Sequence, residues 1–345
     1  MFTLQTSTGG CTHSGESSPR ILGVQRTLAQ RLVPPQQLHG ETAFSVGICA
    51  ADHAVGIDDL IDTIEHESYP PGFVLNEIIV VASGLDLSAR ALLKGSLNRH
   101  PKMILIEEPT RQGKAEAINR IIDHFGGEFL VLVNSDAHPE PGSLSRLLKV
   151  ISRDSTVGLV SASPVIQNTG GITGGVLKLM WEAHNQCLAT LNQAEQNNHC
   201  CDELIIIRAR ALKKLPNDAV NDGAYLAGAA HRAGYTISFC NEAKVRIDVP
   251  ERFGDLLRQR RRIVYGHVQI LRSVGESPRT LESMLINKPR LGLSILIRSL
   301  ARSPESVLFL PVAVVGEFFS VTRAAVDTLT MTKKHVPWDR VGHRA

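Results

Sequence analysis

Between residues 44 and 165, short apolar segments alternate with segments whose apolar residues recur at helical spacing. Stripes of the form i, i+3, i+4, i+7 predict amphipathic helices that carry Ile57, Ile118 and Leu144. This alternation is typical of parallel strands joined by crossover helices. The expected fold class is therefore α/β, with a Rossmann-like half in this region. The segments expected to be strands are Phe44–Ala50, Glu77–Ala82, Met103–Ile106, Phe129–Val133 and Val157–Ser161.

The expected strand at 129–133 ends abruptly in Asn134-Ser135-Asp136. Open α/β sheets bind their ligands beyond the carboxyl ends of the strands. The turn after the first strand, residues 50–56, lacks the G-x-G-x-x-G pattern of dinucleotide-binding proteins, and the chain has no Walker A sequence. A nucleotide can instead be held through Mg²⁺ or Mn²⁺, which needs only one or two carboxylates besides phosphate oxygens. Asp136 is the candidate ligand for such a cation.

Residues 166–250 are less regular. Four glycines at 170, 171, 174 and 175 indicate a flexible loop before a helix over Leu177–Leu191. Asn221 or Asp222 is expected to cap a further helix that ends near Gly234. Additional strands are expected at Leu204–Ile207, Thr236–Cys240 and Val245–Val249.

A helix with an unusual polar side is expected at residues 254–272. Gln259 and Arg262 lie three residues apart, so both can reach one ligand. The basic run from Arg258 to Arg262 is also typical of a solvated helix face. The apolar residues expected to share one arc are Leu256, Leu257, Ile263, Val264, Val268 and Leu271.

Composition narrows the functional classes. The chain has 345 residues, of which 43% are hydrophobic, so disorder throughout is excluded. Its formal charge is only +3, and no basic block with interleaved aromatic residues occurs, so nucleic acid is not an expected partner. The six cysteines form no C-x-x-C pair, which favours reduced, cytosolic thiols. His199-Cys200-Cys201 is expected to contain a partly buried thiol pair, because adjacent residues alone cannot enclose a tetrahedral ion.

The two ends of the chain differ in character. Residues 1–40 are rich in small polar residues and lack the apolar core of a signal peptide, so a mobile tail is expected. The apolar pieces at 291–297 and 307–316 are too short to span a bilayer but suit an interfacial helix or hairpin. Lys333, Lys334 and Trp338 would anchor it. The alternative is a pair of helices packed on the rest of the protein or at a dimer interface.

Several short motifs occur in a characteristic order: Phe44–Ile48, Glu77–Val81, Arg111–Asn119, Asn134–Asp136, Asp222 and Gln259–Ile263. On these motifs the chain resembles the family 2 glycosyltransferases of the GT-A fold, especially the membrane-associated branch related to cellulose and hyaluronan synthases. The resemblance covers about residues 44–270. It implies a mixed central sheet, and transfer of a sugar from a nucleoside-diphosphate donor with inversion at the anomeric carbon. The donor is expected to be a UDP-sugar.

The resemblance also implies roles for individual residues. Asp222 would be the general base that takes the acceptor proton, with a plain helix N-cap as the alternative, and Asp136 would hold the cation. Apart from the resemblance, His138 is a candidate further ligand two residues beyond Asp136, and the alternative is a histidine in a surface turn. Gln259 and Arg262 would line the acceptor or diphosphate side. The donor would be bound by Asn134, Asp136, Lys114, Ser83 and Arg111. For Lys114 and Arg111 a solvated pair near a helix start is the alternative.

Some positions depart from the family pattern. Asn134 replaces the first Asp of D-x-D, Ala82-Ser83 replaces an Asp pair near the base, and Ile263 replaces the Trp of Q-x-x-R-W. These changes leave open a non-catalytic sugar-nucleotide-binding scaffold. A nucleotidyltransferase shares the half-sheet, but it would carry a Gly-rich basic loop after the first strand, which this chain lacks.

The expected organisation has three parts: a tail at 1–40, a GT-A catalytic domain at 41–280 and a C-terminal helical region at 281–345. The last part would place the enzyme at the cytoplasmic face of the cell membrane. The acceptor would be a lipid-linked or polymeric glycan, and a homo-oligomer is left open.

Overall fold

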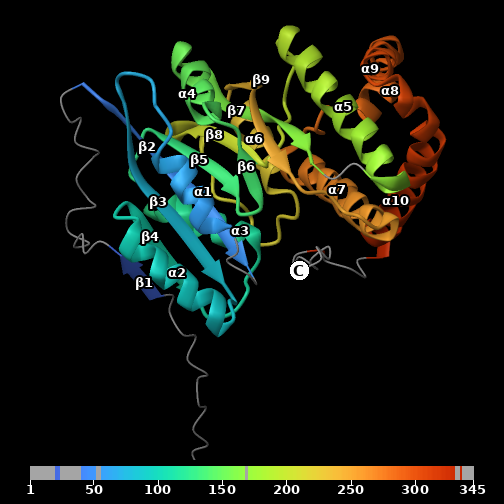
Figure 1. Ribbon diagram of the computed structural model, residues 1–345. Helices are drawn as coiled ribbons and strands as arrows, with labels where there is room; N and C mark the ends of the chain where they lie inside the picture. Colours follow the sequence, from blue (N-terminus) through green and yellow to red (C-terminus); the bar gives the residue numbers. More distant parts are fainter. Residues whose placement is uncertain (1–19, 24–39, 52–55, 168–169, 331–334, 336–345) are drawn as a thin grey trace, which may run out of the picture.

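The computed structural model describes residues 20–23, 40–51, 56–167, 170–330 and 335. In this part of the chain one nine-stranded sheet has the order β1-β4-β3-β2-β5-β8-β7-β9-β6 (Figure 1). The strands are β1 Arg20–Gly23, β2 Thr42–Ala51, β3 Phe73–Ser83, β4 Met103–Glu108, β5 Phe129–Asn134, β6 Ala137–Pro139, β7 Val157–Ile166, β8 Leu204–Arg208 and β9 Thr236–Ile247.

The predicted parallel half is confirmed. Strands β4, β3, β2 and β5 are parallel neighbours. One apolar cluster packs α1, α2 and α4 on one face of the sheet, and a second packs α3 and α6 on the other. The helices of these two layers are α1 Ile57–Glu65, α2 Leu87–Arg99, α3 Lys114–His124, α4 Ser143–Arg153 and α6 Asp222–Arg232.

Beyond β5 the sheet is mixed. Strand β8 is antiparallel to both β5 and β7, and Val133 at the end of β5 pairs with Leu204 at the start of β8. The residues before β8 therefore lie at the carboxyl end of β5. Strand β9 is continuous where the sequence predicted two strands, because its pairing with β7 resumes after an irregularity opposite Ala162 and Ser163.

Helix α5, Gly171–Gln193, begins earlier than predicted. The expectation of a flexible glycine loop is wrong for Gly171, Gly174 and Gly175, which lie inside the helix. A Cβ at Gly175 would lie 2.3 Å from the ring of Phe309, so the glycine allows the η3 segment Pro304–Phe309 to pack closely on α5.

The helix predicted at 254–272 is α7, Phe253–Val274. Its predicted apolar arc is only partly right. Leu256 is buried, but Leu271 is 48% exposed and Ile270 is buried in its place. This difference arises because Ile270 and Val274 pack against Ala224 of α6.

The C-terminal helices are α8 Leu281–Asn287, α9 Pro289–Arg302 and α10 Leu310–Thr330. They lie on one side of the molecule, with α5 and α7 between them and the sheet (Figure 1). Ion pairs join α10 to α7, with Arg260 against Glu317 and Arg261 against Asp327. The run Arg258–Arg262 is therefore not simply a solvated face.

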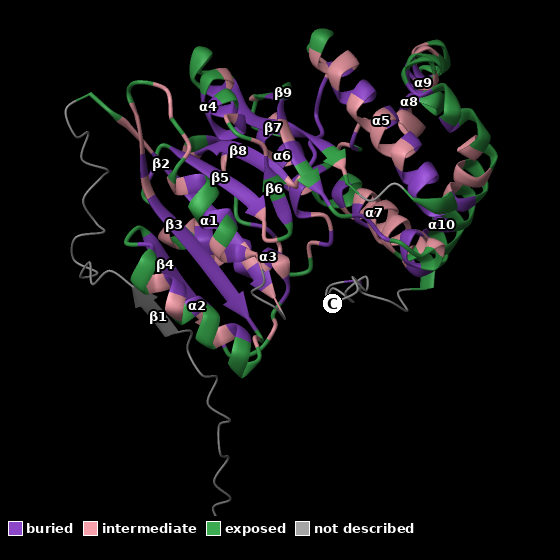
Figure 2. Cartoon of the chain, in the orientation of Figure 1, coloured by how far each residue is buried: buried purple, intermediate pink, exposed green. Residues whose placement is uncertain are grey.

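One expectation for this region is corrected. The apolar pieces were predicted to be too short to span a bilayer, but residues Pro304–Thr330 form 27 residues of helix that is long and apolar enough to do so, by length and composition alone. The piece at 307–316 is part of a longer helix because η3 leads directly into α10, whereas the piece at 291–297 lies in α9. Only 22% of the most apolar window is buried, and the outer surface of α10 is largely exposed (Figure 2). The proposed anchors Lys333, Lys334 and Trp338, and nearly all of the expected tail at 1–40, lie outside the described residues.

Candidate functional site

The site is built at the carboxyl ends of the parallel strands, on the face covered by α3 and α6. Gly113 has a φ of 106°, a conformation that L side chains rarely adopt, and it turns the chain into α3 so that Lys114 is the first helical residue. Asp222 is the first residue of α6, whose N-cap is Asn221. The sequence left Asn221 or Asp222 as the cap, and the structure leaves the carboxylate of Asp222 for another role.

Lys114 joins two carboxylates. Its Nζ lies 2.8 Å from Oδ2 of Asp222 and 3.2 Å from Oδ2 of Asp202. Burial raises the pKa of Asp222, and Lys114 offsets part of that rise. Burial alone would lower the pKa of Lys114, but the two carboxylates raise it overall, so the lysine remains charged. The three groups form a largely buried cation between two anions.

Two glycines bring these segments together. A Cβ at Gly223 would lie 2.3 Å from Cβ of Asp202, and one at Gly266 of α7 would lie 2.7 Å from Cβ of Asn221. The Cys200 thiol also donates a hydrogen bond to the carbonyl of Gly223. The loop before β8, the start of α6 and the middle of α7 thus meet at contact distance.

A second acidic corner lies between β5 and β8. The Nδ2 of Asn134 donates to Oε2 of Glu203 at 2.5 Å, and the backbone N–H of Asn134 donates to the carbonyl of Glu203 at 3.1 Å. Burial, Asp202 and Asp136 raise the pKa of Glu203 to about 8. Asp136 itself is exposed. Asp202 and Glu203 were not among the predicted site residues, because their only sequence signal is an acidic pair directly before an apolar strand.

Basic and amide groups face the same region from other elements. The guanidinium of Arg262 interacts electrostatically with Asp222, Asp202, Arg111 and Glu203, and burial lowers its pKa. Gln259 is half-buried one turn earlier on α7. Arg111 approaches Gly84, since a Cβ on that glycine would lie 3.4 Å from Cβ of Arg111. Arg262 thus lies near the acidic residues and Arg111 lies near Gly84 and Arg262. Among the described residues no side-chain hydrogen bond fixes Gln259.

Two other predicted residues lie at the edges of the site. Ser83, at the end of β3, is buried and donates to Glu108 of β4 at 2.5 Å. Burial raises the pKa of Glu108. His138 is exposed on β6, where it pairs with Arg246 of β9. Within the described ranges no hydrogen bond or ion pair joins His138 to Asp136.

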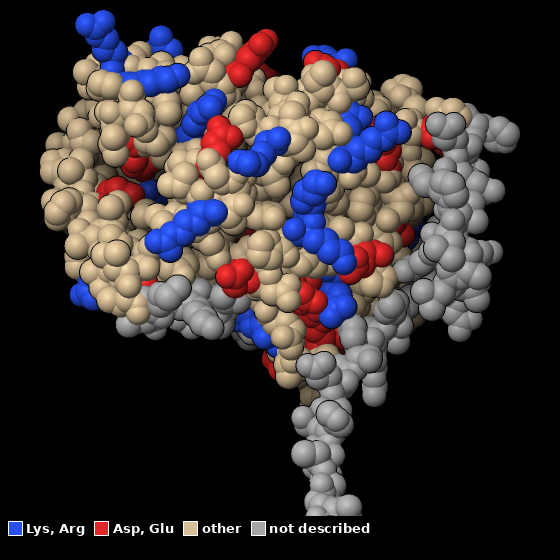
Figure 3. Space-filling view, turned by 180° about the vertical axis from the view of Figure 1, so that it is seen from behind, with Lys and Arg blue, Asp and Glu red and all other residues tan. Residues whose placement is uncertain are grey.

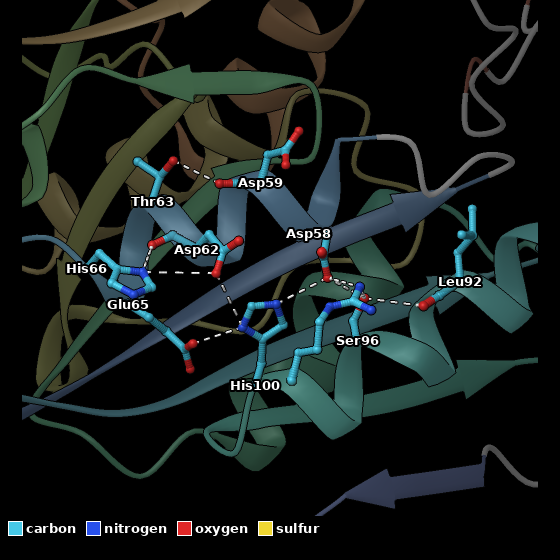
Figure 4. Close-up of polar contacts among 10 residues, drawn as sticks. Asp58, Asp59, Asp62, Thr63, Glu65, His66, Leu92, Ser96 and His100 are labelled. Carbon is cyan, nitrogen blue, oxygen red and sulfur yellow. Dashed lines mark hydrogen bonds and ion pairs between the residues drawn. The ribbon is translucent and has the colours of Figure 1, made fainter.

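The described residues contain one group of three His, Cys, Asp or Glu side chains whose ligand atoms are close enough to hold a metal ion, and it lies away from Lys114. Side chains of Asp58, Asp62 and His100 place ligand atoms within 4.8 Å of one another on α1 and after α2 (Figure 4). These atoms already have partners, since Arg99 lies 2.6 Å from Asp58 and His100 lies 2.8 Å from Glu65. The hydrogen bond from Arg99 is the largest cause that lowers the pKa of Asp58 to about 2. The group therefore links α1 to α2 by ion pairs, on the sheet face opposite Lys114.

On the face of the molecule shown in Figure 3, basic and acidic side chains are interspersed.

Comparison with known proteins identifies one matching family profile and several similar sequences. The family profile described as Glycosyl transferase family 2 matches residues 45–216. A poly-beta-1,6-N-acetyl-D-glucosamine synthase of Staphylococcus epidermidis is 22% identical over 241 residues, which are 68% of this chain and 56% of that protein. The synthase of the same name from Staphylococcus aureus strain COL is 22% identical over 200 residues, 56% of this chain and 48% of that protein. The chain thus spans about half the length of the curated relatives it matches.

A solved structure is also similar. The mannosyltransferase PcManGT from Pyrobaculum calidifontis, in complex with GDP-Man and Mn²⁺, matches with a TM-score of 0.59 at 20% identity, over 87% of this chain and 90% of that chain. At this identity the likeness concerns the fold alone. It confirms the expected GT-A fold with a mixed central sheet.

Proposed function

We propose that this chain, which belongs to glycosyltransferase family 2, transfers a sugar from a nucleoside diphosphate to a hydroxyl group of a glycan or lipid-linked acceptor, with inversion at the anomeric carbon. The observation that carries the proposal is the ion pair of Lys114 with Asp222 and Asp202 beside the end of β5. The electrostatic interactions of Arg262 with both acids add a second cation to the same place. Such a mixed cluster suits a reaction in which a proton and a diphosphate leave from neighbouring positions.

In the proposed reaction the acceptor oxygen attacks the anomeric carbon while the bond to the diphosphate breaks. Asp222 accepts the acceptor proton, because its carboxylate is buried and fixed by Lys114. Arg262 and Arg111 supply fixed positive charge toward the departing diphosphate. Gln259 is assigned to the acceptor side and Ser83 to the donor base. These two assignments rest on the match of the sequence to the family motifs.

The residues at the end of β5 fit a divalent cation. Asp136 offers an exposed carboxylate next to a second acid, and hard oxygen donors of this kind suit Mg²⁺ or Mn²⁺. When bound there, the cation neutralises charge on the leaving diphosphate. His138 stays a further candidate ligand. The solved mannosyltransferase of similar fold contains Mn²⁺ with GDP-Man, which supports a cation and a nucleotide sugar but leaves UDP and GDP as alternatives.

We further propose that the C-terminal part, residues 281–345, holds a catalytic domain at 41–280 on the cytoplasmic face of the cell membrane. Exposed apolar side chains gather on α9 and α10, including Leu293 at 52% and Phe318 at 75% exposure. Arg290 and Arg298 are exposed on α9 among them. Apolar side chains flanked by basic ones favour an anionic lipid surface. A second copy of the chain is the alternative occupant.

Thermal unfolding with a panel of nucleoside diphosphates and sugar nucleotides tests the proposal. Ligand at 100 times its Kd is expected to stabilise the native state by about 2.7 kcal/mol. We expect a shift that requires Mn²⁺ or Mg²⁺, is abolished by chelator and by Asp136→Ala, and persists in Asp222→Asn. Sugar transfer should be lost in Asp222→Asn.

A non-catalytic scaffold is the second candidate, motivated by Asn134 in place of an acid. It would bind the same nucleotides without turnover, and Asp222→Asn would then change nothing. Absence of any nucleotide-dependent shift in folded protein would contradict both functions.

A further inference from the structure

Asn134 and Glu203 are held together at the corner where β5 ends and β8 begins. The side-chain amide of Asn134 donates to Oε2 of Glu203 at 2.5 Å, and their backbones are also hydrogen bonded. The antiparallel course of β8 places these two residues side by side, because Leu204 pairs with Val133. Glu203 thus lies next to position 134, where the family pattern has an aspartate and this chain has an asparagine.

The acidic residues at the site differ in whether they have an ion-pair partner. Asp222 and Asp202 share the cation of Lys114. Asp136 lies two residues beyond Asn134, which is hydrogen bonded to Glu203, and neither acid has an ion-pair partner among the residues that the structure describes. Two acidic side chains at the end of one strand can supply the oxygen donors that a divalent cation needs.

We propose that Glu203 is the second carboxylate of the cation site at Asp136, and that it takes the place of the acid missing at Asn134. This inference rests on the proposed function. Asn134 is then a positioning residue, since its amide fixes Oε2 of Glu203 by a charge-assisted hydrogen bond. Within the described part of the chain Oε1 of Glu203 makes no hydrogen bond, so one oxygen is available to the cation.

The chemistry of the pair permits a reciprocal test. Glu203→Gln removes the charge but keeps the shape and an oxygen that accepts from Asn134. Asn134→Asp combined with Glu203→Gln exchanges the acid and the amide, and the glutamine can donate to the new aspartate in return. The exchange therefore preserves the hydrogen bond, the net charge and the number of carboxylates near Asp136.

Binding of Mn²⁺ to the full chain, in the presence of UDP or GDP, is the measurement, with free Mn²⁺ counted by electron paramagnetic resonance. We expect Glu203→Gln to weaken Mn²⁺ binding at least tenfold and the exchanged double variant to return within about threefold of wild type. Glu251→Gln, which removes an exposed carboxylate elsewhere, is the matched control and should leave binding unchanged. Thermal unfolding of each variant shows that it is folded.

The outcomes separate this inference from the proposed function. Wild-type binding in Glu203→Gln, together with loss in Asp136→Ala, overturns the role of Glu203 and leaves the function standing. If Glu203→Gln loses Mn²⁺ binding and the folded double variant does not recover it, Glu203 does not take the place of an acid at position 134. If the wild type binds a nucleoside diphosphate without taking up Mn²⁺, the cation site itself fails and the inference fails with it.

Discussion

The Nζ of Lys114 lies 2.8 Å from Oδ2 of Asp222, so the lysine at the start of α3 and the acid at the start of α6 share their charges. Burial favours the protonated acid, whereas the lysine favours the carboxylate. A general base must be deprotonated at the working pH. The lysine therefore sets how much of Asp222 is competent for the proposed proton transfer.

Replacing Lys114 by Met should raise the pKa of Asp222, since burial and Asp202 then act without an opposing cation. We expect kcat/KM at pH 7 to fall by about 100-fold or more, and the acid limb of its pH profile to move to higher pH. The profile would be measured with the donor identified by thermal unfolding. Lys149→Met, at an exposed position of α4, is the control. A uniform loss of activity with an unmoved acid limb would contradict this role.

Gly223 should not tolerate even a methyl group. A Cβ there would lie 2.3 Å from Cβ of Asp202, and Asp202 shares Lys114 with the proposed base. Gly223→Ala should therefore displace the loop before β8 and reduce turnover at least tenfold. Gly254→Ala is the matched control, because no atom lies within 4 Å of the corresponding Cβ in α7. Full activity of Gly223→Ala would show that the loop shifts without consequence.

The parallel half of the fold was predictable because its strands and helices carry separate periodicities. The apolar stripe at Ile57, Leu60, Ile61 and Ile64 is buried as one face of α1, as expected for an amphipathic helix. The position of Asp136 followed from the same argument, since ligand chemistry lies at the carboxyl ends of parallel strands.

The part of the fold after β5 was less predictable, because its strands pair with partners that are remote in sequence and local sequence patterns do not indicate those partners. Glu203 reaches Asn134 only because β8 runs antiparallel between β5 and β7. The glycines at the start of α5 were interpreted as a loop, although Gly175 makes room for Phe309 from a distant segment. In both cases the deciding partner is remote in sequence.

Three imidazoles beside the site should make the protein sensitive to acid. The rings of His184 and His199 are 5.6 Å apart and those of His199 and His267 are 5.3 Å apart. Burial, reinforced for His184 and His267 by neighbouring imidazoles, lowers their pKa values to about 3, 4 and 3 for His184, His199 and His267. Each is therefore neutral in the folded protein at pH 5.

The sign of the effect follows from proton binding. The unfolded chain protonates these groups below about pH 6.5, whereas the folded protein does not. Each imidazole therefore lowers the free energy of unfolding by about 1.4 kcal/mol for every pH unit by which the pH falls between about pH 6 and pH 4. We expect the loss to be shallower in His199→Gln by about that amount, measured by denaturant unfolding at several pH values. His66→Gln, at an exposed position, is the control. An unchanged slope in His199→Gln would contradict burial of the neutral imidazole.

The outer face of α10 should bind lipid. Val315, Phe318 and Leu329 are 69%, 75% and 82% exposed and lie within one helical arc. Each replaced by Ser removes roughly 1 kcal/mol or more of apolar transfer free energy. The triple variant should bind anionic vesicles at least tenfold more weakly in a sedimentation assay. Its unfolding midpoint should stay close to wild type, because the buried contacts of α10, such as Asp327 with Arg261, are untouched. Leu87→Ser with Leu92→Ser, on exposed apolar positions of α2, is the matched control. If the triple variant instead separates an oligomer and leaves vesicle binding intact, the face belongs to a second copy of the chain.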